Sequence, residues 1–245
     1  MDTSYWTVLN PDIQQLETRK LMHGKYCYRL AVFAVGCAIL RQTNDLDKDI
    51  EFRNNSRSYN WAGSWRRSPI TASDADKLRH LHEVMTYTDT GLRLNDFPNV
   101  KVRVEEPHIQ FYSTSSKELE QVAHVLEYGD NGLFTSIMMP KDSDTLTHLL
   151  NGYTIRKRIS EWPYRILLRD GRYSYETKSA LRNYLKNLDS EIKVPPNLWA
   201  QLEKPGWIWG GYVYVRDSSL ATMLAMIDGR LVSKVEEYKT MASSL

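Results

Sequence analysis

The chain has 245 residues, of which 42% are hydrophobic and 25% are charged, an ordinary balance for a folded protein that excludes disorder as its dominant state. Its formal net charge is only +2, so any surface that binds nucleic acid must be a local basic patch. Two cysteines are too few for a disulfide scaffold or a cysteine-based metal site.

The first residues of the chain do not have the pattern of a signal peptide, which joins a basic segment to an apolar one. The longest apolar run, residues 30–40, is far shorter than the roughly 20 residues that a membrane helix needs. We therefore expect a cytoplasmic protein without a membrane partner.

The first quarter of the chain predicts an arm, a buried strand and a short helix. Residues 1–25 are expected to form an N-terminal arm with a short helix that Asn10 caps and that carries Pro11 in its first turn. Residues 26–36 are rich in strand formers, which indicates a buried strand. Residues 44–52 have acidic residues where the first turn of a short helix prefers them.

Residues 53–72 form the main predicted loop, and two helices are expected after it. Ser73, with Asp76 three residues later, resembles a capping box at a helix start. Residues 100–104 alternate apolar and polar, as a half-exposed strand does, and residues 108–112 continue the extended structure. Ser115 and Glu118 then form a second predicted capping box, before a helix with an apolar face.

The second half repeats this plan. Residues 164–168 predict a strand, and a helix is expected from Ser174 onward. Residues 209–224 run from a strand into a helix, with Asp217 as the expected N-cap. Apolar residues recur along that helix with the spacing of one helical face, and Gly229 provides a stop.

Two alignments suggest that the halves are related. With one constant shift, residues 111–112 fall on residues 213–214 and the predicted caps Ser115 and Asp217 coincide. Residues 28–32 also resemble residues 164–168. We therefore predict an α+β fold of two related strand-helix-strand-helix halves, a ferredoxin-like duplication with a mixed or antiparallel sheet. The alternative is a chance resemblance, because no residue-level motif is seen to repeat.

This interpretation divides the chain into residues 1–25 as arm and helix, 26–130 as the first half and 153–245 as the second half. The halves are expected to pack as one compact unit. Turn-rich residues such as Asn131-Gly132 and Asn151-Gly152 lie near the boundary between them.

The basic and aromatic loop is the strongest functional candidate. Arginines bind phosphate in bidentate fashion, and aromatic rings offer faces on which unpaired bases stack. The loop residues concerned are Arg53, Arg57, Tyr59, Trp61, Trp65, Arg66 and Arg67. A second concentration of positive charge in the second half consists of Arg156, Lys157, Arg158, Arg165, Arg169 and Arg172. The competing interpretations are that the tryptophans anchor the loop on the core, or that these residues form a protein interface.

Metal chemistry is weakly indicated. Asp170 followed by Glu176-Thr177-Lys178, or by Glu191-Ile192-Lys193, loosely matches the carboxylate and Glu-x-Lys pattern of a metal-dependent nuclease. His80 and His82 are two apart on a predicted helix and so point to different faces, which does not suit a shared metal. No cofactor is indicated.

The hypothesis that best fits the sequence is a non-enzymatic binding protein that holds nucleic acid through the basic and aromatic loop. One alternative is a structural or assembly protein that uses the same surfaces, together with the region of Trp199, Trp207, Trp209 and Tyr212, as interfaces with a protein partner or with itself. The other alternative is the metal-dependent nuclease.

Overall fold

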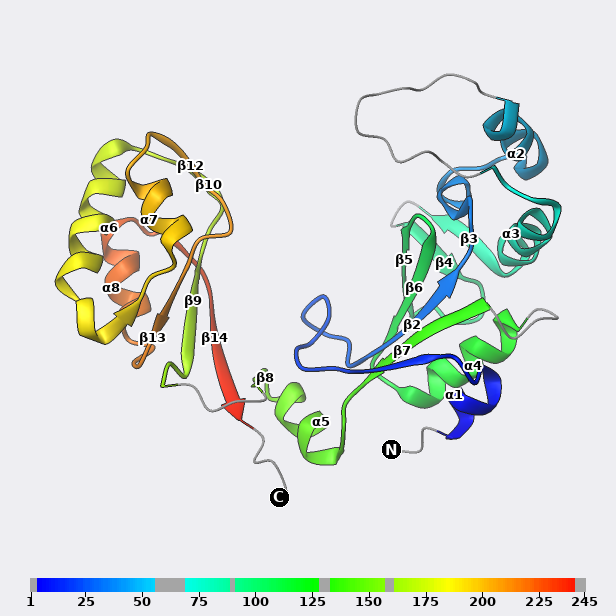
Figure 1. Ribbon diagram of the computed structural model, residues 1–245, viewed down its shortest axis with the longest axis horizontal. Coiled ribbons are helices and arrows are strands. Elements are labelled where there is room, and N and C mark those ends of the chain that lie inside the picture. The colour runs from blue at the N-terminus through cyan, green and yellow to red at the C-terminus, as the bar shows by residue number, and fades with distance from the viewer. Residues whose placement is uncertain (1–3, 56–68, 89–90, 128–132, 157–160, 241–245) are drawn as a thin grey trace. The chain divides into compact units, whose positions relative to one another are not determined.

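The computed structural model describes residues 4–55, 69–88, 91–127, 133–156 and 161–240. Its contacts divide the chain into two compact units, residues 1–143 (unit 1) and 144–245 (unit 2). In the described part of each unit, helices pack against one face of a five-stranded sheet (Figure 1). The opposite face is called the open face below, although in unit 1 the His23 and Tyr26 rings pack on Tyr112 there. The division falls inside the turn-rich segment between the predicted halves. Whether the halves pack together as one compact unit stays a prediction.

Unit 1 is built on a sheet of strand order β1-β7-β2-β6-β5, with a separate hairpin of β3 and β4. Strands β1 and β7 are parallel, and the other neighbours in the sheet are antiparallel. The elements are α1 (Ser4–Leu9), β1 (Gln14–Glu17), β2 (Tyr28–Phe33), η1 (Cys37–Arg41), α2 (Leu46–Asn55), α3 (Ala72–Val84), β3 (Met85–Thr88), β4 (Gly91–Leu94), β5 (Lys101–Glu105), β6 (His108–Ser113), α4 (Ser116–Leu126) and β7 (Phe134–Met139).

Unit 2 is built on a sheet of strand order β11-β13-β9-β14-β8, with β10 and β12 paired beside it. Strands β8 and β14 are parallel, and the other neighbours in the sheet are antiparallel. The elements are α5 (Ser143–Leu150), β8 (Thr154–Arg156), β9 (Tyr164–Leu168), β10 (Gly171–Tyr173), α6 (Tyr175–Asn187), η3 (Asp189–Glu191), β11 (Ile192–Lys193), α7 (Pro196–Leu202), β12 (Gly206–Ile208), β13 (Tyr212–Val215), α8 (Leu220–Ile227) and β14 (Val232–Thr240).

The two sheets have the same topology. Taken in chain order, β1, β2, β5, β6 and β7 occupy the same places in their sheet as β8, β9, β11, β13 and β14 do in theirs. In each sheet the first strand pairs in parallel with the last. Without that first strand, each unit reads βαββαβ with the fourth strand beside the first, the ferredoxin-like arrangement. The predicted α+β fold with two related halves is confirmed.

Helices α4 and α6 form where apolar residues recur at helical spacing behind a serine. Ser115 accepts a hydrogen bond from the Glu118 backbone N–H, and Ser174 accepts one from Thr177 in the same way, so both predicted N-caps are confirmed. The reciprocal half of the capping box predicted for Ser115 and Glu118 is wrong, because the Ser115 N–H donates to Ser113 Oγ. Each helix buries one face against its own sheet. In α4 that face consists of Leu119, Val122, Ala123 and Leu126.

The predicted helix after Asn10 is wrong. The helix, α1, precedes Asn10 and buries Trp6 and Leu9. The Asn10 side chain accepts a hydrogen bond from the Asp12 N–H and donates one to the Phe134 carbonyl, so it shapes the turn between α1 and β1. The residues after it pair with β7 as a strand. Asparagine is common both at helix N-caps and in turns. Here it lies in a turn, because the residues after it pair with the distant strand β7.

Two other predicted caps are displaced by two residues. Helix α3 has Thr71 as N-cap in a capping box with Asp74, in place of Ser73 and Asp76. Helix α8 begins at Leu220, and Asp217 accepts hydrogen bonds from the N–H and hydroxyl of Ser219 in a turn before it. Closely spaced polar residues offer several local hydrogen-bonding patterns, and packing selects among them.

Glu106 fixes the start of η1 and the end of α2. Its carboxylate accepts hydrogen bonds from the N–H groups of Gly36, at 2.7 Å, and Ala38, at 3.0 Å, and from the Arg53 guanidinium, at 2.9 Å. Burial acts to raise the pKa of Glu106, but these hydrogen bonds outweigh it, so the pKa lies below its ordinary value. Gly36 has a φ of +89°, and a Cβ there would lie 2.6 Å from Ile70 Cδ1.

We expect Glu106→Gln to lower the free energy of unfolding by about 1–3 kcal/mol at neutral pH, because the Arg53 guanidinium loses its anion. Since the folded pKa is lowered, the stabilisation by Glu106 is fully present above the ordinary glutamate pKa and is lost as the pH falls through the folded value. Urea unfolding at several acidic pH values checks this. The difference between wild type and variant should shrink on acidification, and a constant difference would contradict the assignment.

Candidate nucleic-acid interface

The open face of the unit 2 sheet carries arginine and tyrosine side chains. Directly opposed residues in neighbouring strands share a face, and Arg165 on β9 lies opposite Tyr214 on β13 and Glu236 on β14. The alternate residues of these strands, such as Ile166 and Val213, are fully buried in the core under the helices. We define the open-face cluster as Arg156, Arg165, Tyr212, Tyr214 and Tyr238.

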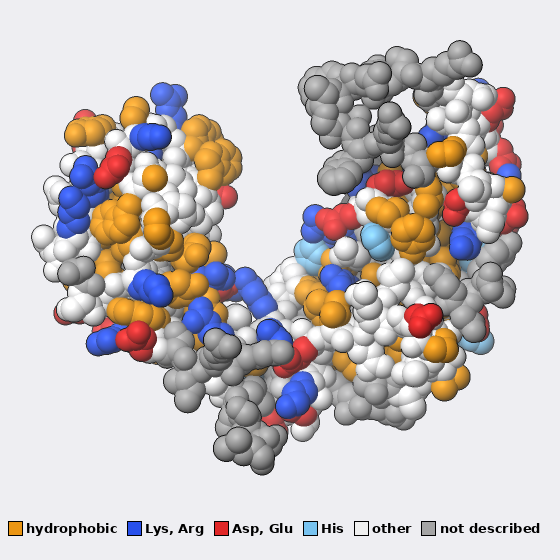
Figure 2. Space-filling model, viewed as in Figure 1, with side chains coloured by type: hydrophobic (Ala, Val, Ile, Leu, Met, Phe, Trp, Pro, Cys, Tyr) orange, Lys and Arg blue, Asp and Glu red, His pale blue; other side chains and the backbone are white. Residues whose placement is uncertain are grey.

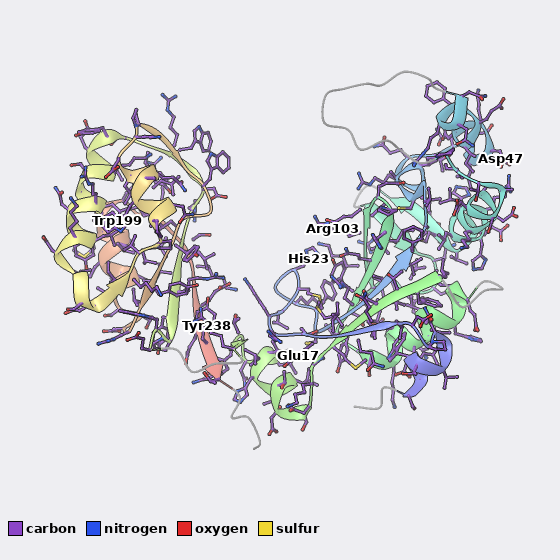
Figure 3. The ribbon with its side chains drawn as sticks, viewed as in Figure 1. Glu17, His23, Asp47, Arg103, Trp199 and Tyr238 are labelled. Atoms are coloured by element: carbon purple, nitrogen blue, oxygen red, sulfur yellow. The ribbon has the colours of Figure 1, made fainter. Side chains whose placement is uncertain are left out.

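Arg156, at the end of β8, is the outermost charge of the open-face cluster. Its guanidinium carbon lies 3.5 Å from the centre of the Tyr238 ring and 5.1 Å from that of Tyr214. In the part of the chain that the structure describes, Arg156 forms no ion pair with a carboxylate. Figure 3 places Tyr238 on β14, which is the parallel neighbour of β8. The stacked guanidinium is therefore held in place while its positive charge is not neutralised by a described residue.

Arg165 is held by a buried carboxylate. Its Nε donates to Glu236 Oε2 at 3.0 Å, and the Glu236 side chain is only 1% exposed. Burial acts to lower the pKa of Arg165, but the hydrogen bonds and charge of Glu236 outweigh it and the pKa lies above its ordinary value. The guanidinium carbon is 5.3 Å from the Tyr212 ring centre. Arg165 is thus a fixed cation that orients the tyrosines around it.

Two lysines add positive charge to the same face. Lys193 lies opposite Tyr214, and Lys234 alternates with Glu236 along β14, with 3.8 Å between Lys234 Nζ and Glu236 Oε1. Four cationic side chains thus share this face with one buried carboxylate among the described residues. Figure 2 shows Lys and Arg side chains over the region of β9 and β14 in unit 2.

The predicted site residues fall into four groups. Arg156 lies in the open-face cluster, Arg169 and Arg172 are exposed on either side of the turn into β10, and Arg53 is 9% exposed and paired with Glu106. The rest lie outside the described residues and stay a prediction: Arg57, Tyr59, Trp61, Trp65, Arg66, Arg67, Lys157 and Arg158.

Sequence reasoning missed Tyr214 and Tyr238 as site residues and assigned Tyr212 only to a protein interface. Tyr212 and Tyr214 alternate with buried valines, a pattern that marks one face of a strand. That pattern does not reveal which charged residues share the face, because the register with β8 and β14 sets this.

A second candidate surface is an exposed pair of tryptophans. The Trp207 and Trp209 rings are stacked with their centres 4.7 Å apart and their planes 10° apart, although their exposed fractions are 50% and 58%. The Gln201 side chain donates to the Trp209 carbonyl and accepts from the Trp209 N–H, which fixes the backbone beneath the stack.

Two residues of the nuclease pattern, Asp170 and Lys178, are engaged in structural contacts. Asp170 accepts a hydrogen bond from the Gly210 N–H at 2.6 Å. Lys178 is 1% exposed and donates to three backbone carbonyls. Across the described ranges, no group of three or more His, Cys, Asp or Glu residues is placed to hold a metal ion.

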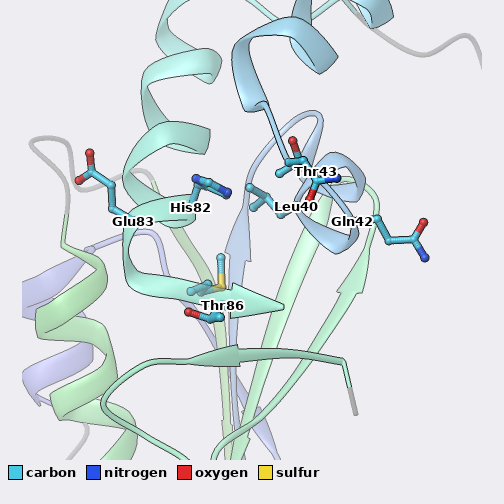
Figure 4. A pocket seen from close by; sticks show the side chains of 8 residues that line it. Leu40, Gln42, Thr43, His82, Glu83 and Thr86 are labelled. Carbon is cyan, nitrogen blue, oxygen red and sulfur yellow. The ribbon is translucent and has the colours of Figure 1, made fainter. Parts of the chain in front are cut away.

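A pocket of about 600 Å³ lies in unit 1 between η1 and the end of α3 (Figure 4). Its lining includes Leu40, Thr43, His82 and Glu83. In Figure 4 the His82 ring points toward Leu40, whereas the Glu83 carboxylate points away from it. The pocket therefore does not bring its two titratable side chains together.

None of the described helices is both long enough and apolar enough to cross a membrane. Comparison of the chain with protein-family models, with curated proteins and with solved structures found no match.

Proposed function

We propose that the protein binds single-stranded or irregular nucleic acid, with the open-face cluster of unit 2 as a contact surface. The observation that carries the proposal is the Arg156 guanidinium, stacked 3.5 Å above Tyr238 and without a described carboxylate partner. A planar cation held this way can bind a phosphate or stack on a base. The half-buried Tyr212 and Tyr214 rings beside it suit sequence-tolerant stacking, which contributes about 1–3 kcal/mol per base.

Charge supports nucleic acid over a neutral ligand. Lys193, Lys234 and Arg156 leave an excess of positive charge on this face, whereas the net charge of the whole chain is only +2. A local patch of this kind is what a chain with balanced charge needs to attract a phosphate backbone. Residues 56–67 of the predicted loop remain a second contact surface in this proposal, without Arg53, which lies in α2 and pairs with Glu106.

We expect the protein to bind a labelled single-stranded oligonucleotide more weakly at 200 mM than at 50 mM salt, and Arg156→Ala to weaken binding about tenfold. The slope of log affinity against log salt should also fall by about one, because one phosphate contact is lost. Fluorescence anisotropy measures both quantities.

Arg182→Ala is the matched control. The substitution removes the same charge, but Arg182 lies on α6, on the helix side of the sheet. Equal weakening by both variants would mean that only net charge matters and would contradict a site at Arg156. Absence of binding at 50 mM salt would contradict the function itself.

Protein assembly is the second candidate, and the exposed Trp207 and Trp209 stack favours it. Light scattering on the same samples separates the two functions. A defined oligomer that dissociates on dilution, in a protein that does not bind the oligonucleotide, would favour assembly through the tryptophans.

A further inference from the structure

An arginine and a tyrosine face each other at equivalent places in the two sheets. Arg29 on β2 lies opposite Tyr112 on β6, as Arg165 on β9 lies opposite Tyr214 on β13. The same residues coincide in the two sequence alignments, 28–32 with 164–168 and 111–112 with 213–214. The halves therefore do share a residue-level motif, which the sequence alone did not reveal because its two residues lie on different strands.

The third position of this motif differs between the units. Arg165 has Glu236 as its neighbour on β14, whereas Arg29 has Met138 at the equivalent place on β7. The Arg29 Nε atom is buried and has no hydrogen-bond partner among the described residues. A buried guanidinium N–H without an acceptor is costly, by about 1–3 kcal/mol or more for a charged group. Arg29 therefore needs an anionic acceptor of the kind that Glu236 provides for Arg165 in unit 2.

A hollow of about 430 Å³ lies beside Arg29 on the open face of the unit 1 sheet. Its other lining residues are neutral or weakly basic: Gln14, Ala31, His108, Gln110, Thr135 and Ser136. Two carboxylates on strands of this sheet are already paired: Glu105 on β5 forms an ion pair with Arg103 and accepts a hydrogen bond from Gln110, and Glu17 on β1 forms an ion pair with Arg19. Hydroxyl, amide and imidazole groups of this kind can donate to an anion.

We propose that Arg29 binds an oxyanion, a phosphate or carboxylate group of a ligand, in the place that the Glu236 carboxylate fills in unit 2. The flat guanidinium binds two oxygens of such a group at once. The site does not depend on nucleic-acid binding by unit 2. A free phosphate compound, a carboxylate compound and the phosphate of a nucleic acid all present the required chemistry.

The test uses the full chain, titrated separately with inorganic phosphate, with acetate and with a short oligonucleotide, at ionic strength held constant with chloride. Isothermal calorimetry should show saturable binding of at least one of the two small anions to the wild type. Arg29→Met should weaken that binding at least tenfold. Which small anion binds identifies the ligand class. Binding of the oligonucleotide alone would assign the site to nucleic acid only if Arg29→Met weakens it.

Met138→Glu provides a second, independent test. The new carboxylate should pair with Arg29 as Glu236 pairs with Arg165, so the variant should lose anion binding and keep or raise its thermal midpoint. Met138→Gln, which has the same size without the charge, should retain binding. If Arg29→Met does not fold, the comparison of these two variants decides.

The proposal is overturned if the wild type binds none of the three probes, if Arg29→Met binds as tightly as the wild type, or if Met138→Glu and Met138→Gln bind equally. Anion binding that depends on Arg29, in a protein whose Arg156→Ala variant binds the oligonucleotide as the wild type does, would contradict only the function proposed for unit 2.

Discussion

Glu236→Gln is expected to lower the free energy of unfolding of unit 2 by about 3 kcal/mol, the loss typical when one partner of a buried ion pair is removed. The variant keeps the size of the side chain but leaves the Arg165 guanidinium between strands without its anion. The cost comes from desolvation of an uncompensated charge more than from the lost attraction. Hydrogen exchange followed in peptides from β9 and β14 measures the effect within unit 2.

Two variants separate this explanation from a general weakening of β14. Glu237→Gln changes the adjacent residue, whose side chain is 35% exposed and paired with Lys239, and should cost no more than about 0.5 kcal/mol. The double variant Arg165→Met/Glu236→Met removes both charges and should recover most of the lost stability. If the double variant is as unstable as Glu236→Gln, the buried charge is not the cause.

The parts of the fold that the sequence predicts correctly are those whose determinants lie close together in the chain. The amphipathic helices α4 and α6 were predictable because spacing and cap lie within a few residues of one another. The related strands β2 and β9, and β6 and β13, were predictable from short similar segments. In each of these cases the determinants are local in the chain.

The rest of the fold depends on partners far away in the chain. Strand β1 was predicted as part of a helix, since only its pairing with β7, more than 100 residues later, makes it a strand. The open-face cluster depends on the register of four strands in the same way. Arg156 could be singled out for its charged neighbourhood, but Tyr238 could be assigned to it only once β8 and β14 were known to pair.

The contacts of the Lys178 side chain also depend on residues far from it in the chain. Sequence reasoning placed it in a nuclease pattern, yet it lies on the inward face of α6 with Leu181 and Leu185. Its ammonium group donates to the carbonyls of Gln201 and Lys204 at 2.9 Å and of Trp207 at 3.4 Å. A cation at the end of α7 also complements the negative end of that helix. One lysine thus joins α6, α7 and β12.

We expect Lys178→Met to lower the free energy of unfolding of unit 2 by about 2–4 kcal/mol. Three backbone carbonyls lose their donor, while the apolar stem is retained and removal of a charge that burial disfavours offsets part of the loss. Lys186→Met is the matched control. It lies on the same helix but is exposed, so it should change stability by no more than about 0.5 kcal/mol. Urea unfolding of both variants provides the comparison.

The same variant tests what holds the tryptophan stack. Because Lys178 binds the Trp207 carbonyl and Gln201 binds both backbone groups of Trp209, losing the lysine should loosen the backbone beneath the stacked rings. The near-ultraviolet circular dichroism of the folded variant should therefore weaken in the tryptophan region, whereas Lys186→Met should leave it unchanged. An unchanged spectrum together with a large loss of stability would show that the stack is set by Gln201 and ring contact alone.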